Sequence, residues 1–301
     1  MLRHNNRFAG PDRPGRSLGG RSLQDRLRRM PIPGKRVLRP LRERLRHLTS
    51  SRQFQAYCVG TPKSGTMSVA AILSRSYRSA HQPDSRELFA VIRQRQSGLP
   101  ETRLRRWVVN RDRRLWLEMD SSHLLHGIVD VLANAFPEAK FILTIRDCYS
   151  WLESEINEQL GPGSSKPPWD QAYDLRYGGS RGDKADMPLI ERGLFPITAY
   201  LDYWTRHNEV VLAVPPHRLL VLRTNDISKA TPQVAGFLGI PATSIDADRA
   251  HVHRRSENRI RLWELIDPGY VTGLAQVHCR HLMERFFPEI RSPEDAGLLH
   301  G

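Results

Sequence analysis

The chain has 301 residues and a formal net charge of +14, a length sufficient for one large domain with a substantial core. Residues 1–52 contain 15 Lys and Arg against 3 Asp and Glu, so +12 of the charge lies there and +2 in the rest of the chain. The composition therefore argues against a uniformly basic domain and predicts a basic, largely disordered N-terminal arm.

The arm has few apolar or aromatic residues. We expect it to solubilise the protein or touch anionic surfaces, without specific nucleic-acid binding. No apolar run is long enough for a transmembrane or secretory segment, and the cysteines at positions 58, 148 and 279 are dispersed, as in a reducing compartment. These features predict a cytoplasmic protein with one domain over residues 53–301.

The first predicted strand, residues 56–60, leads through a Gly- and Pro-containing turn into a helix predicted over residues 66–77. Backbone N–H groups at such a helix start favour an anion, and Lys63 adds a mobile positive charge. The turn departs from the nucleotide-kinase motif, because Thr66 and Met67 stand where that motif has Lys and Ser or Thr. We therefore predict a site for a phosphate ester.

Strands and helices alternate along the rest of the domain. In chain order we expect a helical basic stretch at 86–106, a strand at 114–119, a helix at 123–135, a strand at 140–146, a helix from 149, a helix at 195–214, a strand with its exit loop at 218–226 and a helix at 231–239. This order predicts an α/β fold with a central parallel sheet flanked by helices, a three-layer sandwich like that of P-loop NTPases. Ligands of such sheets bind beyond the carboxyl ends of the strands.

The strand predicted over residues 140–146 ends in an arginine, Arg146. An arginine there can hold a phosphate monoester through charge-assisted hydrogen bonds, and a nearby hydroxyl can add a donor. The alternative is a surface ion pair of Arg146 with Asp147 or Glu153.

The turn with its Pro-Lys-Ser-Gly-Thr core resembles the phosphosulfate-binding loop of sulfotransferases that use 3′-phosphoadenosine 5′-phosphosulfate (PAPS). In that family an arginine at a strand end and a serine eight residues later hold the 3′-phosphate; here they match Arg146 and Ser154. A basic loop of the relatives matches Arg254 and Arg255, which are equally well read as a solvated charge cluster. Thr224 stands where many relatives have an aromatic residue against adenine. The resemblance implies these donor-binding residues: Thr61, Pro62, Lys63, Ser64, Gly65, Thr66, Met67, Arg146, Ser154, Arg254 and Arg255.

The resemblance also implies an in-line sulfuryl transfer, with Lys63 as the leaving-group cation and a general base near the end of the strand at 114–119. Glycosaminoglycan sulfotransferases have a glutamate at a comparable strand end, matched by Glu118, and small-molecule cytosolic relatives have a histidine further on, matched by His123. Asp120 lies between them, and the lysine that follows the glutamate in the family is missing here. Glu118 is our first choice, with His123 and then Asp120 as alternatives.

The sequence is thus interpreted as a sulfotransferase that moves a sulfuryl group from PAPS to a hydroxyl of a small molecule, carbohydrate or lipid and releases adenosine 3′,5′-bisphosphate. An ATP-dependent P-loop phosphotransferase and a non-catalytic binding protein on the same fold stay open as alternatives. The acceptor is not defined by the sequence: residues 161–186 are expected to form a flap on the acceptor side, where Trp169, Arg176 and Tyr177 would suit several acceptor classes. No metal is expected, because the C-terminal His and Cys residues lack a paired ligand spacing.

Overall fold

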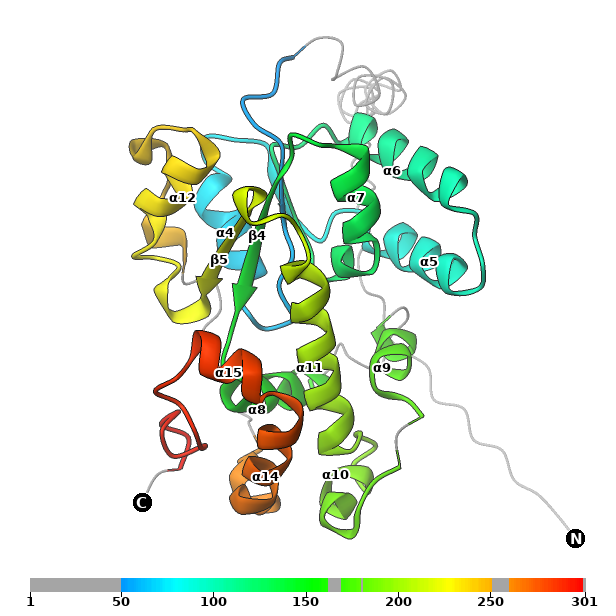
Figure 1. Ribbon diagram of the computed structural model, residues 1–301, viewed down its shortest axis with the longest axis vertical. Coiled ribbons are helices and arrows are strands. Elements are labelled where there is room, and N and C mark those ends of the chain that lie inside the picture. The colour runs from blue at the N-terminus through cyan, green and yellow to red at the C-terminus, as the bar shows by residue number, and fades with distance from the viewer. Residues whose placement is uncertain (1–49, 162–168, 180, 251–259, 300–301) are drawn as a thin grey trace, which may run out of the picture. The chain divides into compact units, whose positions relative to one another are not determined.

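The computed structural model describes residues 50–161, 169–179, 181–250 and 260–299. The chain divides into two units, Met1–Glu43 and Arg44–Gly301, and the described residues all belong to the second. Within them lies a parallel sheet of five strands in the order β2-β3-β1-β4-β5; Figure 1 labels β4 and β5. The strands are β1 (Ala56–Cys58), β2 (Ser79–His81), β3 (Met119–Ser121), β4 (Lys140–Ile145) and β5 (Leu219–Arg223).

The register aligns the carboxyl ends of the central strands at one edge of the sheet. Cys58 of β1 is level with Ser121 of β3 on one side and with Ile142 of β4 on the other. β4 is buried over five consecutive residues, as expected for a parallel strand covered on both faces. The predicted α/β class with a central parallel sheet is confirmed.

Alternate side chains of the strands fill two separate cores, one on each face of the sheet. Tyr57 and Phe141 pack with α5 (Ser85–Gln96), α6 (Glu101–Leu115) and α7 (Val129–Ala135). Cys58 and Ile142 pack on the other face with α4 (Thr66–Leu73) and α12 (Thr231–Leu238). Helices therefore cover both faces, as Figure 1 shows.

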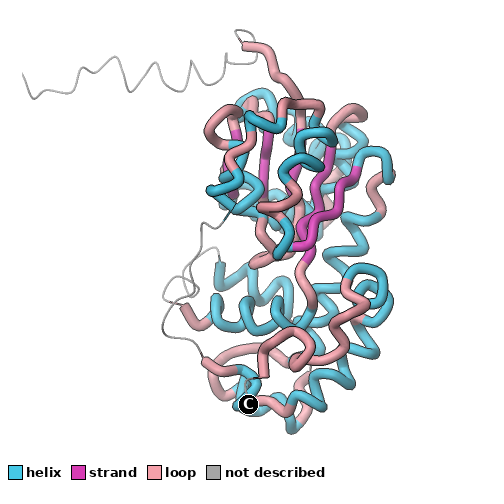
Figure 2. Tube along the Cα trace, turned by 90° about the vertical axis from the view of Figure 1, so that its left-hand side faces the viewer, coloured by secondary structure: helices cyan, strands magenta, loops and turns pink. Residues whose placement is uncertain are grey.

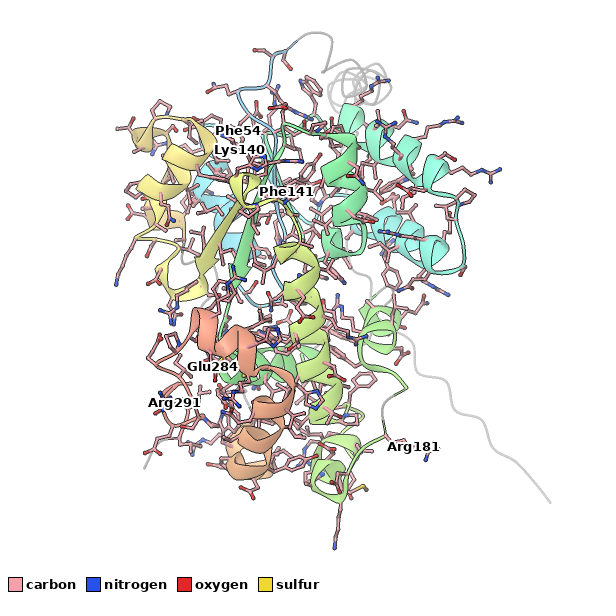
Figure 3. The ribbon with its side chains drawn as sticks, in the orientation of Figure 1. Phe54, Lys140, Phe141, Arg181, Glu284 and Arg291 are labelled. Atoms are coloured by element: carbon pink, nitrogen blue, oxygen red, sulfur yellow. The ribbon has the colours of Figure 1, made fainter. Side chains whose placement is uncertain are left out.

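A third core belongs to a group of helices beyond the carboxyl edge of the sheet, visible below the strands in Figure 2. Figure 3 marks this polarity: Lys140 and Phe141 begin β4 at one end, and Glu284 and Arg291 lie in the helical group at the other. The group comprises α8 (Cys148–Gln159), α9 (Trp169–Tyr177), α10 (Met187–Ile190), α11 (Ile197–Leu212), α13 (Leu262–Leu265), α14 (Pro268–His278) and α15 (Arg280–Phe286). Six short 3₁₀ helices complete the described residues: η1 (His123–Ile128), η2 (Lys184–Asp186), η3 (Pro216–Arg218), η4 (Thr224–Asp226), η5 (Ala242–Ser244) and η6 (Ala247–Ala250).

The predicted boundaries of the elements between residues 79 and 119 are wrong. The basic stretch at 86–106 forms two helices, because Gly98 takes a φ of 94° after α5 and Pro100 precedes α6. α6 then runs on to Leu115 and ends at Trp116, whose φ is 47°, so the strand predicted over 114–119 begins only at Met119. The edge strand β2 was not predicted, since it is short and half-buried and has no apolar run.

No helix in the described part of the chain is both long and apolar enough to cross a bilayer. The cysteines are buried and free of disulfides.

Candidate active site

The turn between β1 and α4 is held in one conformation by close packing. A Cβ on Gly60 would lie 2.0 Å from Thr144 Oγ1 and 2.4 Å from the Thr144 carbonyl oxygen, so only glycine fits against β4. Gly65 takes a φ of 104° as the N-cap of α4, and Lys63 a φ of 62°. A lysine in the left-handed region is strained by about 1–3 kcal/mol and persists only where its surroundings enforce it.

The start of α4 is suited to an anion. No side chain caps it and its first turn holds no acidic residue, so its N–H groups have no side-chain acceptor. The Thr61 hydroxyl is buried without a hydrogen-bond partner among the described residues. Backbone N–H groups and a hydroxyl lacking an acceptor fit a phosphate or sulfate oxygen.

The hydroxyls of Ser64 and Thr66, both predicted to bind phosphate, have different hydrogen-bond partners within the protein. Ser64 Oγ donates to the Thr61 carbonyl at 2.7 Å and lies 2.9 Å from Thr144 Oγ1, so it closes the turn. Thr66 is the first residue of α4, and its Oγ1 lies 3.2 Å from His81 Nε2. The next residue, Met67, is half-buried.

One face of α8 lies against this turn. Trp151 Nε1 donates to the Pro62 carbonyl at 2.8 Å, and Glu158 Oε2 accepts from Lys63 Nζ at 2.8 Å two turns further along. Ser154 is buried on the same face between these two contacts. Arg146 follows β4 directly, ahead of Asp147, whose carboxylate caps α8 by accepting from Ser150 N at 2.8 Å. The structure therefore brings Lys63, Ser154 and Arg146 to the same edge of the sheet.

Thr224 has a clear role in this arrangement. Its hydroxyl is 2.6 Å from the Ser64 carbonyl and 3.1 Å from the Ile145 carbonyl, so it joins the end of β5 to the turn and to β4. At this position the chain has a structural tie in place of the aromatic residue of many relatives.

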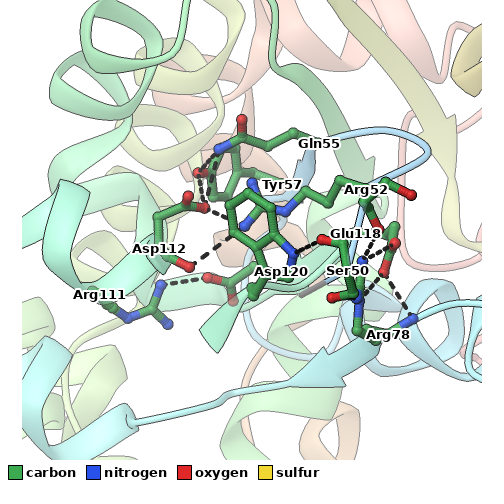
Figure 4. Close-up of polar contacts among 11 residues, drawn as sticks. Ser50, Arg52, Gln55, Tyr57, Arg78, Arg111, Asp112, Glu118 and Asp120 are labelled. Carbon is green, nitrogen blue, oxygen red and sulfur yellow. Dashed lines mark hydrogen bonds and ion pairs between the residues drawn. The ribbon is translucent and has the colours of Figure 1, made fainter. Parts of the chain in front are cut away.

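The structure does not bring Glu118 to this edge. Glu118 precedes β3, where its carbonyl accepts from Ala56 N at 2.8 Å, so it lies at the amino edge of the sheet. Its carboxylate is held by Arg78, with Nε at 2.8 Å and a terminal nitrogen at 2.5 Å (Figure 4). The ranking of Glu118 as first choice for the base assumed that the strand ended there, whereas it begins one residue later.

Asp120 is also directed away from the turn. It is buried on β3 in an ion pair with Arg111 of α6, on the sheet face that α6 covers (Figure 4). Arg52, which the predicted boundary assigns to the arm, joins the same group of side chains through Asp112 at 2.8 Å.

His123 does lie at the carboxyl edge, directly after β3. Ser122 N donates to the Cys58 carbonyl at 3.0 Å, and the Ser122 hydroxyl caps η1, so His123 begins beside the end of β1. Its Nε2 is 2.5 Å from a terminal nitrogen of Arg176, and its Nδ1 is 3.0 Å from the Gln82 side-chain amide. Burial, and then the Arg176 charge, hold the pKa of His123 well below its ordinary value.

The protonation of His123 follows from its partners. A guanidinium only donates, so His123 Nε2 accepts from Arg176 and Nδ1 carries the proton. The Gln82 amide must then turn its oxygen toward Nδ1, an assignment that hydrogen bonding decides. His123 is thus a neutral imidazole whose basic nitrogen is covered by Arg176.

Glu155 and Glu158 complete the site and were not predicted. Glu155 of α8 is buried, with Oε1 3.7 Å from Arg176 and 2.9 Å from the Tyr177 hydroxyl. The helical spacing of Trp151, Glu155 and Glu158 could have predicted this placement. It puts both carboxylates on the face of α8 that meets the turn between β1 and α4, here called the Lys63 turn.

Some predicted residues stand apart. Arg254, Arg255, His251 and His253 lie outside the described residues. His278 and His281 each pair with a different carboxylate, Asp202 at 2.6 Å and Glu209 at 2.9 Å. Within the described ranges no three His, Cys, Asp or Glu side chains gather as metal ligands.

Comparison with known proteins identifies the family of this chain. A family model described as a sulfotransferase domain matches residues 55–255, more than half of the chain. The chain therefore belongs to the sulfotransferase family, and its activity is that of a sulfotransferase in general terms.

Solved structures similar to this chain include two bacterial sulfotransferases. The one from Alicyclobacillus acidocaldarius is 12% identical, with 78% of this chain and 96% of that chain covered and a TM-score of 0.42. The one from Mycobacterium avium is 13% identical, with 84% and 81% covered and a TM-score of 0.43. Comparison with curated protein sequences gives no match.

Proposed function

We propose that the chain transfers a sulfuryl group from PAPS to a hydroxyl acceptor. The observation that carries this proposal is the placement of α8, which contacts the Lys63 turn through Trp151 and Glu158 and begins just after Arg146. Two groups suited to oxyanions thereby share one edge of the sheet, as a donor with a 5′-phosphosulfate and a 3′-phosphate requires. The α4 start, which no described side chain caps, and the Thr61 hydroxyl, which has no partner among the described residues, support the same ligand.

In the proposed reaction the acceptor oxygen forms a bond to sulfur while the bond from sulfur to the 5′-phosphate oxygen breaks. His123 Nε2 takes the acceptor proton, and Lys63 stabilises the charge growing on the leaving oxygen. The products are a sulfate ester and adenosine 3′,5′-bisphosphate. His123 replaces Glu118 as the proposed base, because only His123 lies at the carboxyl edge, and its lowered pKa keeps it neutral at pH 7.

Lys63 and His123 are connected through the acidic face of α8. Lys63 bonds to Glu158, and Glu155 one turn earlier pairs with Arg176, which contacts His123. The proposed leaving-group cation and the proposed base are thus both linked to the face of α8 that meets the turn between β1 and α4, which supports a role for both in one site.

A transfer assay with radiolabelled PAPS over phenol, sugar and lipid acceptors tests the proposal, with the product identified by mass spectrometry. We expect sulfate transfer in the wild type, loss of at least about a hundredfold in rate for Lys63→Ala and His123→Ala, and no change for the exposed control Arg280→Ala. Transfer of phosphate from Mg-ATP in place of sulfate would contradict it and favour the phosphotransferase. Binding of adenosine 3′,5′-bisphosphate without transfer to any acceptor would favour the non-catalytic binding protein.

A further inference from the structure

Arg176 is a buried cation whose charge the described residues compensate only in part. Its side chain is only 7% exposed, and its ion pair with Glu155 spans 3.7 Å, too long for a hydrogen bond. The rings of Tyr173 and Tyr203 each lie 5.6 Å from the guanidinium carbon. A guanidinium has five N–H donors, and a buried one is normally met by a short, two-pronged contact to an oxyanion.

Glu155 does not supply that contact. Its Oε1 accepts from the Tyr177 hydroxyl at 2.9 Å, and its Oε2 is buried without a hydrogen-bond partner among the described residues. Glu155 itself is fully buried, and burial raises its pKa. Among the described residues, this buried cation and carboxylate face each other without a close hydrogen bond, which leaves donors of the guanidinium for another acceptor.

Among the described residues, the one short hydrogen-bond partner of Arg176 is the atom that the proposed reaction needs. His123 Nε2 has to receive the acceptor proton, and Arg176 covers it at 2.5 Å. The guanidinium stays protonated at any working pH, so it must be drawn away before His123 can act. A neutral hydroxyl gives the Arg176 guanidinium no interaction that would replace the contact with His123, whereas an oxyanion accepts two charge-assisted hydrogen bonds from it.

We propose that Arg176 selects the acceptor: it binds an oxyanion next to the reacting hydroxyl and in doing so uncovers His123 Nε2. This inference rests on the proposed function, because it takes His123 as the base. With hydrogen bonds of about 2.8 Å to each partner, the hydroxyl oxygen and the oxyanion lie on the order of 3–5 Å apart. The acceptor is then a hydroxyl compound with a carboxylate or a phosphate close to the hydroxyl.

Matched acceptor pairs test the selection. Mandelate with its methyl ester examines the carboxylate, and glycerol 3-phosphate with glycerol the phosphate, each with radiolabelled PAPS. In the wild type we expect the anionic member to have a kcat/KM about ten- to a hundredfold higher. In Arg176→Gln the ratio should fall to near one while the neutral member keeps or gains rate. Arg176→Lys should keep part of the preference. Arg181→Gln, at an exposed arginine five positions further along the chain, should keep all of it (Figure 3).

A second readout does not depend on the choice of acceptor. The His123 imidazole signal, followed by NMR with adenosine 3′,5′-bisphosphate bound, should shift when acetate or inorganic phosphate is added to the wild type. The shift should be absent in Arg176→Gln, and the thermal unfolding of each variant with the bisphosphate shows that it is folded and binds the donor product.

Three results would overturn the inference. One is an equal loss of rate with anionic and neutral acceptors in Arg176→Gln, which would place Arg176 on the donor sulfonate. Another is an unchanged rate with both kinds of acceptor in that variant, and the last is a wild-type His123 signal that does not shift when acetate or phosphate is added. Failure of the proposed function looks different, because the wild type would then transfer no sulfate to either member of any pair or to any other acceptor.

Discussion

Lys63 combines backbone strain with a pre-existing ion pair. Its backbone has a φ of 62°, and its Nζ lies 2.8 Å from Glu158 Oε2. Both side chains are partly exposed, 26% for Lys63 and 55% for Glu158, so solvent screens the pair and its net stabilisation is small. The proposed leaving-group cation is therefore held by a carboxylate that competes with the donor for it.

Glu158→Gln is expected to tighten the binding of adenosine 3′,5′-bisphosphate by about two- to fivefold. The substitution removes one negative charge, which both competes with the ligand for Lys63 and repels the ligand's phosphates. Calorimetric titration measures the change, with Glu191→Gln, an exposed glutamate of the helical group, as the control. Weaker binding in Glu158→Gln would mean that Glu158 positions Lys63 for the ligand.

At the level of single residues, sequence analysis placed the proposed donor-binding residues at the carboxyl edge of the sheet, where the structure has them, but placed its first-choice base there wrongly. Lys63 lies in the turn after β1, Arg146 directly after β4 and Ser154 on α8, the helix that follows, and local pattern defines these elements. Glu118 was misplaced because an error of a few residues in a strand boundary moves a side chain from one edge of the sheet to the other. The contact between His123 and Arg176 joins positions 53 residues apart, and no periodicity reports such a pair.

Among the secondary-structure elements, the β1 turn and α4 are positioned by two glycines with different constraints. Gly60 has no room for a Cβ. A Cβ on Gly65 would lie 2.4 Å from Ile227 Cδ1, so it would fit only if that methyl group moved aside. Gly65 also needs its positive φ, which costs other residues about 1–2 kcal/mol. The turn is thus fixed from β4 on one side and from the end of β5 on the other.

Gly60→Ala is expected to destabilise the fold by several kcal/mol, because its Cβ would meet the backbone of β4, which cannot move aside. Gly65→Ala should cost about 1–3 kcal/mol. Gly236→Ala, in α12 with open space around it, should be neutral or stabilising by up to about 1 kcal/mol. Urea unfolding gives the three values, and similar losses at Gly60 and Gly236 would show that the turn is not packed as described.

The alternation of elements was predictable and their ends were not. The long apolar pattern of β4 and the amphipathic pattern of α11 gave both elements to within a few residues. α6 exceeded its expected end because its arginines favour a helix as well as a solvated loop, and Trp116 stops it by a left-handed turn that few non-glycine residues adopt. The helix α9 lies inside a stretch whose composition predicted a loop.

For the whole molecule, three histidines lie where the sheet edge meets the helical group: His123 and His207 are buried and His126 is half-buried. The rings of His126 and His207 lie 4.3 Å apart, and His207 Nδ1 is 3.2 Å from the Tyr203 hydroxyl of the same helix, α11. Burial lowers the pKa of His126 to about 4 and holds those of His123 and His207 well below the ordinary value.

These histidines predict a loss of stability in acid. Between pH 6.5 and about 4 the unfolded chain binds a proton at position 126 that the folded protein excludes, so the free energy of unfolding falls as the pH falls through this window. His126 alone accounts for on the order of 3 kcal/mol. Urea unfolding from pH 7.5 to 5 should show a shallower pH dependence for His126→Gln than for the wild type or the exposed control His217→Gln. Parallel pH profiles for all three proteins would contradict the prediction.

The account depends on one donor being held at both of its phosphates, by the Lys63 turn and by Arg146 with Ser154. Calorimetry with adenosine 3′,5′-bisphosphate and with adenosine 5′-monophosphate, which lacks the 3′-phosphate, separates the two contacts. Arg146→Ala should weaken the bisphosphate by about tenfold or more and leave the monophosphate within about twofold, whereas Lys63→Ala should weaken both. Equal effects of Arg146→Ala on the two ligands, or none on either, would contradict the account.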